Sequence, residues 1–446
     1  MPFAPAPPPC PLTRRAFTAG LGAAGAVTLL ASPGRTQPAE AEVTPDGTRI
    51  LRARPGEALS GPLLRVRRDE ELKVRLVNDL PHPLALHWHG VRLPNAMDAV
   101  PRLTQPPIAP GASFDYRFKP PDAGTFWYRA WSLAASERGL SGALIVDEPE
   151  PPAVDQDLML VFDSRQAVPA AGGPSTEQLT VNGRPTFDIP VRPGERIRLR
   201  LLNASGTRLL AVRIDQHRAT VMAIDGQPAE PFTARDARVV LGPGNRTDLF
   251  VDMSLAAGAA TSIVAETATA SATVARLVYQ DAAVARPQPL PEIKSLPANP
   301  LPARMDFARA LRLDLPLDPA ALRPSARQPA RGAPESTRAR VWSSGDGAGA
   351  EPFGPALFSV KRGRAVMLGF SNGLRLPHAV HIHGHAVRLL DNLDDGWKPY
   401  WLDTIAVMPE QTARVAFVGD NPGKWLIECQ RLEQPEKPLA AWFEVT

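Results

Sequence analysis

The sequence has 446 residues, which is long enough for two to four domains with filled hydrophobic cores. Its 50 Lys and Arg nearly balance its 46 Asp and Glu, and the balance falls to +1 when residues 1–36 are set aside. This composition does not indicate nucleic acid or an anionic membrane surface as a partner. No stretch is apolar for long enough to predict a permanent membrane span.

The N-terminal segment has the features of an export signal. Arg14 and Arg15 precede an uncharged run, rich in Ala and Gly, that extends from residue 18 to residue 32. A twin-arginine pair before such a weakly hydrophobic run resembles a Tat signal, whereas the alternative is a basic cap on an ordinary helix. We therefore expect residues 1–41 to be a leader, cleaved between positions 31 and 41, and the mature protein to be periplasmic.

Cysteine usage is sparse, with two residues in the chain. Cys10 lies in the predicted leader, so Cys429 would be alone in the mature protein and could form no disulfide within it. A single thiol in an oxidising compartment is normally buried or metal-bound. We expect Cys429 to be a buried core residue, with metal binding as the alternative.

An internal repeat organises the rest of the chain. Residues 66–78, 191–203 and 360–372 each begin with valine and a basic residue, pass through a turn into an alternating strand, and end in asparagine. The chain also has 50 prolines and many short runs of Val, Leu and Phe, with little helical periodicity. Together these patterns predict an all-β protein of three tandem Greek-key β-sandwiches.

The boundaries of the three modules follow from composition. A Glu- and Pro-rich joint at residues 148–152 separates the first module from the second. Six prolines in residues 282–304 predict an extended connector before the third. We therefore expect the domains at residues 42–148, 153–281 and 305–446.

Histidines concentrate in two short stretches. Six of the eight lie in residues 87–90 (HWHG) and 378–385 (HAVHIHGH). The isolated His82 and His217 are expected to be exposed. Imidazole is a common metal ligand, so the clustering predicts a metal site or the remains of one. Because residues two apart on a strand face the same side, each stretch presents a pair of imidazoles: His87 with His89, and His381 with His383.

The repeat relates the two histidine pairs to each other. His87 lies nine residues after the repeat asparagine Asn78, and His381 lies nine residues after Asn372. The equivalent position of the second module is Val212, so that module offers no imidazole there. We therefore expect the metal site between the first and third modules, with the second module as a spacer or a substrate wall.

Four motifs together resemble those of the three-domain multicopper oxidases, the laccase-like enzymes built from cupredoxin sandwiches. They are HWHG at residues 87–90, GTFWY at 124–128, HxxHxHGH at 378–385 and GKWLI at 423–427, just before Cys429. The resemblance covers the whole predicted mature chain and implies three cupredoxin-like domains. In that family a type 1 copper takes electrons from the substrate, and a cluster of one type 2 and two type 3 coppers reduces dioxygen to water.

The resemblance also implies a set of copper ligands, which this chain holds only in part. Both type 2 ligands remain, as His87 and His381. Of six type 3 histidines two remain, His89 and His383, and the other positions carry Arg129, Trp131, Glu428 and Gln430. The type 1 site keeps His378 and Cys429, has Gln434 in place of a histidine, and has Leu439 at the axial position. Two acids match the proton-delivering acids of the family, Asp98 and Glu433.

These replacements predict the loss of oxygen reduction, because one imidazole per type 3 copper cannot hold a dicopper pair. Arg129 also adds a permanent positive charge where metal ions would lie. We expect Arg129 and Glu428 to pair across the interface of the first and third modules, while Trp131 fills the volume of the lost copper. Without copper, Asp98 and Glu433 would have no catalytic role.

Three functions remain open. The leading interpretation is a non-enzymatic pseudo-oxidase, a binding or stabilising protein similar in role to the copper-free branch of the family that supports cell division in the envelope. The second is a protein that binds one copper or zinc ion through the four remaining cluster histidines. The third is a copper-dependent oxidase of phenols or cuprous ion with a rebuilt site. We expect no four-copper complement, a monomer, and an envelope protein or small molecule as the partner.

Overall fold

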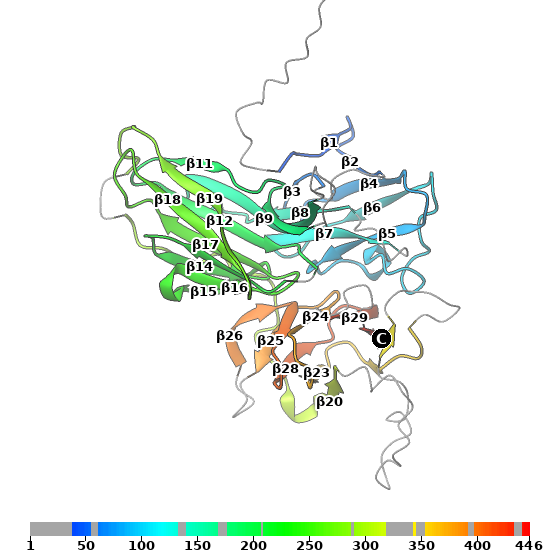
Figure 1. Ribbon diagram of the computed structural model, residues 1–446. Helices are drawn as coiled ribbons and strands as arrows, with labels where there is room; N and C mark the ends of the chain where they lie inside the picture. Colours follow the sequence, from blue (N-terminus) through cyan, green and yellow to red (C-terminus); the bar gives the residue numbers. More distant parts are fainter. Residues whose placement is uncertain are drawn as a thin grey trace, which may run out of the picture. The chain divides into compact units, whose positions relative to one another are not determined.

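A computed structural model describes residues 38–54, 61–132, 140–167, 176–206, 208–286, 290–317, 342–344, 353–390, 397–431 and 439–446. Within these ranges the chain forms β-strands and three short 3₁₀ helices (Figure 1). The strands pair into six sheets, two for each of three successive sandwiches, and the all-β prediction is confirmed. Residues 1–37 of the predicted leader lie outside the described ranges, as do Glu433 and Gln434.

The first sandwich packs a β1-β2-β4-β6 sheet against a β3-β8-β7-β5 sheet. Buried and exposed residues alternate along β3, because successive side chains of a strand point to opposite faces. Buried leucines and aromatic residues from both sheets form one core. The elements are β1 (Glu42–Val43), β2 (Arg49–Ala53), β3 (Leu64–Arg67), β4 (Leu72–Asn78), β5 (Leu84–His89), η1 (Asn95–Met97), β6 (Ser113–Phe118), β7 (Gly124–Ser132) and β8 (Ser141–Asp147).

The second sandwich packs a β10-β9-β12-β17-β14-β15 sheet against a β11-β19-β18-β13-β16 sheet. Its central strand β12 is buried along its whole length, since both of its faces are covered. The elements are β9 (Gln156–Ala167), β10 (Thr176–Val181), β11 (Asp188–Val191), β12 (Arg196–Asn203), β13 (Leu210–Ile214), β14 (Ala219–Ile224), β15 (Gln227–Thr233), η2 (Arg235–Ala237), β16 (Arg238–Leu241), β17 (Arg246–Asp252), β18 (Ala260–Glu266) and β19 (Ser271–Tyr279).

The third sandwich packs a β20-β23-β28-β25-β26 sheet against a β21-β30-β29-β24-β27 sheet, with β22 added beside β30. The elements are η3 (Phe307–Arg309), β20 (Leu311–Pro316), β21 (Ser343–Ser344), β22 (Phe358–Val360), β23 (Ala365–Ser371), β24 (His378–Ile382), β25 (Val387–Leu390), β26 (Trp397–Leu402), β27 (Thr404–Val407), β28 (Thr412–Val418), β29 (Gly423–Arg431) and β30 (Leu439–Val445). The two histidine-bearing stretches therefore lie on β5 and around β24, the equivalent strands of the outer sandwiches.

The asparagine that ends each sequence repeat has one structural role in all three sandwiches. Asn78, Asn203 and Asn372 are almost fully buried. Each side-chain amide donates to two backbone carbonyls and accepts a bond from the backbone N–H two residues further on. Buried polar groups require such partners. These bonds hold the loop that follows the strand, and the next strand begins six or seven residues after the asparagine in each sandwich.

Buried contacts join the first two sandwiches. Trp127 and Ile145 of the first sandwich pack in one apolar cluster with Met159 and Leu202 of the second. A polar network lies beside this cluster, in which the Thr125 hydroxyl donates to an Asp248 carboxylate oxygen at 2.7 Å. The three sandwiches belong to a single compact unit that extends to the C-terminus.

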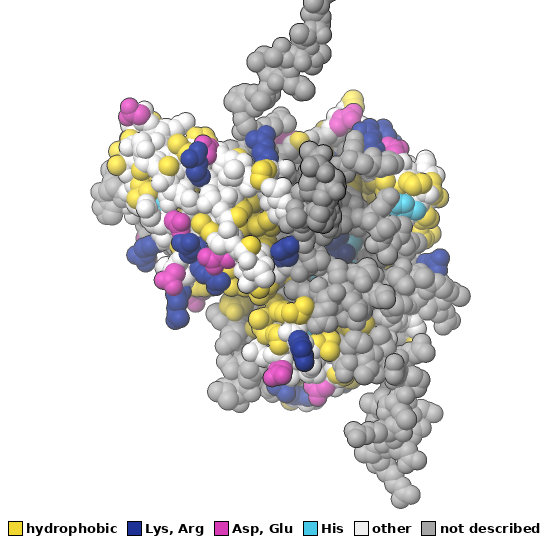
Figure 2. Space-filling model, in the orientation of Figure 1, with side chains coloured by type: hydrophobic (Ala, Val, Ile, Leu, Met, Phe, Trp, Pro, Cys, Tyr) yellow, Lys and Arg dark blue, Asp and Glu magenta, His cyan; other side chains and the backbone are white. Residues whose placement is uncertain are grey.

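The surface carries charges of both signs. On the face shown in Figure 2, basic and acidic side chains lie interspersed, as expected from the nearly balanced composition. In the described part of the chain, no helix has the length and apolar character needed to cross a membrane.

Candidate functional site: a buried histidine cluster

Two strands bring the predicted histidine pairs together. His87 and His89 lie on β5, His381 lies on β24, and His383 follows β24 directly. Each of the four residues is at most 4% exposed. The structure thus gathers into one buried cluster, between the first and third sandwiches, the four histidines that the sequence repeat predicts to share a site. We call these four residues the histidine cluster.

The ring nitrogens of the histidine cluster lie close to one another. Nε2 of His87 is 3.2 Å from Nε2 of His381. The rings of His89 and His381 stack with centroids 3.5 Å apart, and those of His87 and His383 stack with centroids 3.9 Å apart. Two groups of residues have candidate ligand atoms that all lie within 4.8 Å of one another, namely His87, His89 and His381, and His87, Asp98 and His383.

Hydrogen bonds determine which nitrogen of His87 and of His381 carries the proton. Nδ1 of His87 faces two acceptors of Asp98, the backbone carbonyl at 3.4 Å and the carboxylate at 3.3 Å. Nδ1 of His381 lies 3.0 Å from the backbone carbonyl of Asp403. A neutral imidazole has one N–H, so both rings donate from Nδ1 and direct their Nε2 lone pairs at each other. This is the arrangement of two metal-binding imidazoles, each held by an acceptor at its other nitrogen.

Thr404 orients the ring of His89. The Thr404 hydroxyl donates to Asp403 at 2.7 Å, so its oxygen accepts the proton of His89 Nε2, also at 2.7 Å. The lone pair of His89 is then on Nδ1, which is buried and has no hydrogen-bond partner among the described residues. A buried acceptor without a partner costs about 1–3 kcal/mol, so this atom is a further candidate ligand.

The histidine cluster is neutral, with an ionised carboxylate beside it. Burial lowers the pKa of all four imidazoles, and that of His87 to about 4. Burial alone would raise the pKa of the Asp98 carboxyl, but His383 Nδ1 at 3.0 Å and the nearby His87 hold that pKa well below its usual range. Uncharged rings next to an ionised carboxylate offer lone pairs to a cation.

The predicted ion pair between Arg129 and Glu428 is present in the structure. Arg129 is the cross-strand neighbour of His87, and Glu428 is the cross-strand neighbour of His381. Their side chains are 23% and 7% exposed, respectively. Burial would raise the pKa of the Glu428 carboxyl, but the charge of Arg129 lowers it, so Glu428 is ionised. A guanidinium–carboxylate pair therefore joins the two sandwiches beside the histidine cluster.

Two buried residues of the second sandwich, Arg246 and Asp225, support the cluster together with Asp403 of the third, and sequence reasoning missed all three. Arg246 donates to the Asp403 carboxylate at 2.9 Å from Nη1 and at 2.5 Å from Nη2. Asp225 accepts bonds from the backbone N–H groups of Arg246 and Thr404, at 2.9 and 3.1 Å. Burial and the charge of Asp403 raise the pKa of Asp225 to about 6. No motif marks these residues, because they come from loops and strands of two different sandwiches.

The three described residues that the family resemblance places at the type 1 site are buried. His378 and Cys429 are 0% exposed and Leu439 is 1% exposed. Cys429 packs in the hydrophobic core of the third sandwich, which agrees with its expected burial. Gln430 lies against Gly206 of the second sandwich. Three other predicted site groups, Glu433, Gln434 and the side chain of Trp131, lie outside the described residues.

The donor set fits one metal ion and does not fit a trinuclear copper cluster. Four positions that the family resemblance assigns to type 3 imidazoles carry other residues, and two of these residues form the Arg129–Glu428 ion pair. By contrast, two ligand nitrogens about 2.0–2.1 Å from one tetrahedral ion are about 3.3 Å apart, close to the separation in His87 and His381. These two residues would hold the ion, and Asp98 and Asp403 would orient them. An ion bound there would act as a Lewis acid or as cargo.

Comparisons with known proteins agree with this architecture. Residues 42–151, 155–282 and 323–446 each match a multicopper oxidase domain family. The multicopper oxidase MmcO of Mycobacterium tuberculosis is 28% identical to this chain, over 92% of this chain and 88% of the relative. Laccase-3 of Oryza sativa is 34% identical over a shorter alignment, which covers 44% of this chain and 40% of the relative.

Solved structures show the same arrangement of domains. A multi-copper oxidase from Pseudomonas thermotolerans superposes with a TM-score of 0.73 and 29% identity, over 90% of this chain and 99% of that one. Lac15, from a marine microbial metagenome, superposes with a TM-score of 0.69 and 30% identity, over 92% of this chain and 98% of that one. The chain belongs to the multicopper oxidase family, whose members bind copper, and its three sandwiches are cupredoxin-like domains.

Proposed function

We propose that this chain is a multicopper-oxidase-like protein that does not reduce dioxygen. It would act in the periplasm, after twin-arginine export, as a binding or stabilising protein. The observation that carries this proposal is the ion pair between Arg129 and Glu428, at two positions where the family places type 3 ligands. The pair lies directly beside His87 and His381 in the two strand ladders.

The ion pair is incompatible with a dicopper centre for two reasons. First, a guanidinium has no lone pair to offer and does not lose its proton, so Arg129 cannot become a ligand. Second, Glu428 is held by Arg129, so its charge is already compensated and does not attract a further cation. A copper pair would need imidazoles at both positions, and none is available there.

Buried ion pairs and hydrogen bonds that involve no metal join the first two sandwiches. Arg198 is fully buried between Glu148 of the first sandwich and Asp248 of the second, at 2.8 and 2.6 Å. Thr125 and Arg200 extend this network, with Arg200 donating to the Thr125 hydroxyl at 2.9 Å. Removing one partner from such a buried network costs several kcal/mol, about 3–5 for a fully buried pair. Domains joined in this way are consistent with a role in binding or in stabilising a partner.

The second candidate is a mononuclear metal-binding protein, and a separate observation favours it. The Nε2 atoms of His87 and His381 lie 3.2 Å apart. Because burial lowers the pKa of both rings, the rings are uncharged and their Nε2 lone pairs face each other. A cation between them would relieve the repulsion of two lone pairs. One copper or zinc ion suits this site, because imidazole binds both and the acceptors on Nδ1 raise ligand basicity.

Metal loading of the purified mature protein tests both candidates. The protein is incubated with Cu(II), with Cu(I) under a reductant, or with Zn(II), then desalted and measured by mass spectrometry. The leading proposal expects no stoichiometric metal ion, no blue absorption band and no oxygen uptake with a phenolic dye or cuprous ion. One ion per chain that is lost in His381→Ala but kept in His82→Ala would establish the second candidate. A blue band with turnover would instead establish the third alternative, an oxidase with a rebuilt site.

The proposed location has its own test. The twin-arginine pathway reads the arginine pair, so Arg14→Lys together with Arg15→Lys should keep the protein in the cytoplasmic fraction. The unchanged chain should appear in the periplasmic fraction. Equal distribution of both forms would contradict twin-arginine export.

A further inference from the structure

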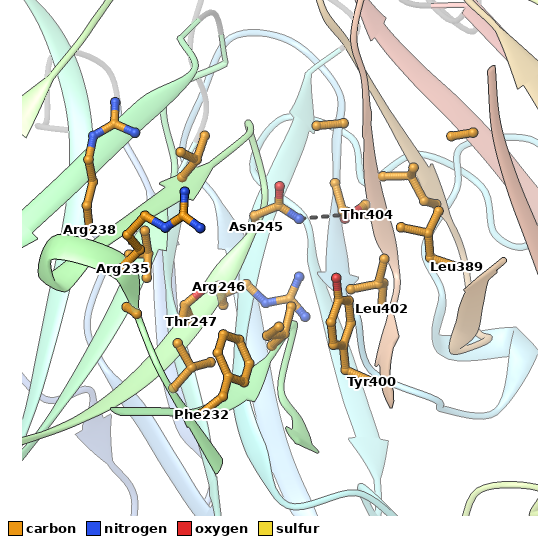
Figure 3. Close-up of a pocket in the computed structure, with 18 of the residues that line it drawn as sticks. Phe232, Arg235, Arg238, Asn245, Arg246, Thr247, Leu389, Tyr400, Leu402 and Thr404 are labelled. Carbon is orange, nitrogen blue, oxygen red and sulfur yellow. Dashed lines mark hydrogen bonds between the residues drawn. The ribbon is translucent and has the colours of Figure 1, made fainter. Parts of the chain in front are cut away.

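A cavity of about 550 Å³ lies between the second and third sandwiches. Strands β14 to β17 and η2 form one wall, and β25 to β28 form the other (Figure 3). The volume is within the range of about 300–1,000 Å³ that is typical of small-molecule sites. None of the four histidines of the histidine cluster lines this cavity.

The charge of the cavity lining is one-sided. Three arginines line it, and no Asp or Glu is found among its described lining residues. Arg246 is neutralised by Asp403, and Arg238 by Glu266 at 3.1 Å. Arg235 has no ion-pair partner among the described residues. One uncompensated guanidinium therefore faces the cavity, and guanidinium groups select carboxylates and other oxyanions.

The rest of the lining is mostly apolar. Phe232 and Val240, both in the lining, are 44% and 53% exposed. In Figure 3 the rings of Phe232 and Tyr400 flank the same part of the cavity, one from each sandwich. A bare inorganic anion would leave these apolar side chains in contact with water. An aromatic anion would cover them, since aromatic rings stack favourably on one another.

Two residues with left-handed backbone conformations follow the exposed Arg235 within η2. Asp236 and Ala237, the next two residues, both have positive φ, at 55° and 48°. Left-handed conformations cost L-residues roughly 1–2 kcal/mol each and often occur at functional sites. Figure 3 shows the Arg235 guanidinium directed toward Asn245, at the centre of the cavity, whereas that of Arg238 is directed away.

We propose that this cavity binds a small aromatic organic anion, a carboxylate or a sulfonate. Arg235 pairs with the anionic group, and Phe232 and Tyr400 enclose the ring. The site goes beyond the function proposed above and does not depend on it, because binding here requires neither metal nor the histidine cluster. Its success or failure therefore leaves the metal-loading experiment unaffected.

Isothermal titration of the full-length mature protein tests the proposal with three probes of one shape. The probes are 1-naphthoate, neutral 1-naphthalenemethanol and cationic 1-naphthylmethylamine. We expect one site per chain and a preference for naphthoate over the alcohol of about tenfold or more, as for a hydrogen bond to a charged group. Absence of saturable naphthoate binding, or equal affinity for the anion and the cation, would overturn the proposal.

Two exposed substitutions, each with a matched control, assign the site. Arg235→Gln should abolish the preference for naphthoate, whereas Arg276→Gln, at an arginine of the same sandwich whose side chain is 54% exposed, should not. Val240→Asp should weaken naphthoate and strengthen the amine, whereas Val43→Asp, at a site that is 57% exposed in the first sandwich, should change neither. Circular dichroism verifies that each variant folds. Unchanged binding in both Arg235→Gln and Val240→Asp would place the ligand elsewhere and refute the assignment.

Discussion

Nε2 of His87 and Nε2 of His381 lie 3.2 Å apart, although 294 positions of the sequence separate the two residues. An aspartate contacts Nδ1, the other nitrogen of each ring: Asp98 for His87 and Asp403 for His381. The two nitrogens thus meet with little freedom to turn away. This preorganisation makes the metal affinity of the site sensitive to residues that do not themselves touch the ion.

Asp98 should control metal affinity through the orientation of His87 and His383. We expect Asp98→Ala to weaken zinc or copper binding about 10–100-fold, the usual effect of losing a residue that orients a ligand. Competition with a chromophoric chelator measures the affinity. Asp115→Ala is the control, because this aspartate is 39% exposed and pairs only with Arg75 on the first sandwich. Equal affinities in the two variants would show that Asp98 does not orient the ligands.

The pair of Arg129 and Glu428 should contribute measurably to stability. Arg129→Gln leaves a buried carboxylate without its partner, so we expect a loss of about 1–3 kcal/mol in the free energy of unfolding. This lies below the cost for a fully buried pair, because the Arg129 side chain is 23% exposed. Urea unfolding of the single variants and of the double variant with Glu428→Gln gives the coupling energy.

The control for this cycle is an exposed pair, Arg276 with Asp188, whose side chains are 54% and 50% exposed. Its coupling energy should be about 0–1 kcal/mol. Additive effects of Arg129→Gln and Glu428→Gln would mean that the two side chains do not interact in solution.

The metal-free protein should lose stability in mild acid. Burial lowers the pKa of His87 from 6.5 to about 4, so the unfolded chain takes up a proton at a higher pH than the folded chain does. Stability that is present above pH 6.5 is therefore lost as the pH falls toward 4, by about 3 kcal/mol for this residue alone. The other three imidazoles of the cluster shift in the same direction.

Thermal unfolding between pH 7.5 and 4.5, after treatment with a chelator, measures this loss. His87→Gln should show a shallower dependence on pH than the unchanged chain. An unfolding temperature that stays constant over this range would contradict the buried neutral state of the cluster.

Gly124 should be essential where the first two sandwiches meet. An added Cβ would clash with the backbone carbonyl of Gly226, which cannot move as a side chain can. Gly111 also has positive φ but has open space around it. We expect Gly111→Ala to cost about 1–2 kcal/mol from backbone strain alone, and Gly124→Ala to cost at least about 1–3 kcal/mol more from overpacking. Equal unfolding temperatures of the two variants would indicate that the backbone around Gly226 shifts to accommodate the added Cβ.

Much of the fold could be predicted because one local device occurs three times. After the buried asparagines Asn78 and Asn372 the following strand begins at the same distance, six residues, so counting from them placed His87 and His381 in equivalent strands. The ion pair between Arg129 and Glu428 could be predicted because the family resemblance places both residues at copper-ligand positions and their charges are opposite. In the structure each residue lies opposite a cluster histidine.

The supporting residues could not be predicted, because their contacts cross between sandwiches. Arg246 and Asp403 are 157 positions apart, and no spacing within one strand relates them. The expected exposure of His217 was wrong because its partner, although in the same sandwich, is distant in the sequence. His217 is 9% exposed, and its Nε2 lies 2.6 Å from the hydroxyl of Tyr279 on a strand of distant sequence.

The second sandwich contributes no imidazole, yet it governs the electrostatics beside the histidine cluster. Its Arg246 is 0% exposed and is the cation that balances Asp403, the aspartate behind His381. Loss of this arginine would leave an uncompensated carboxylate facing two rings, and a proton or a metal ion would have to replace the missing charge. The middle domain therefore supplies the positive charge, on Arg246, that balances the aspartate beside the cluster.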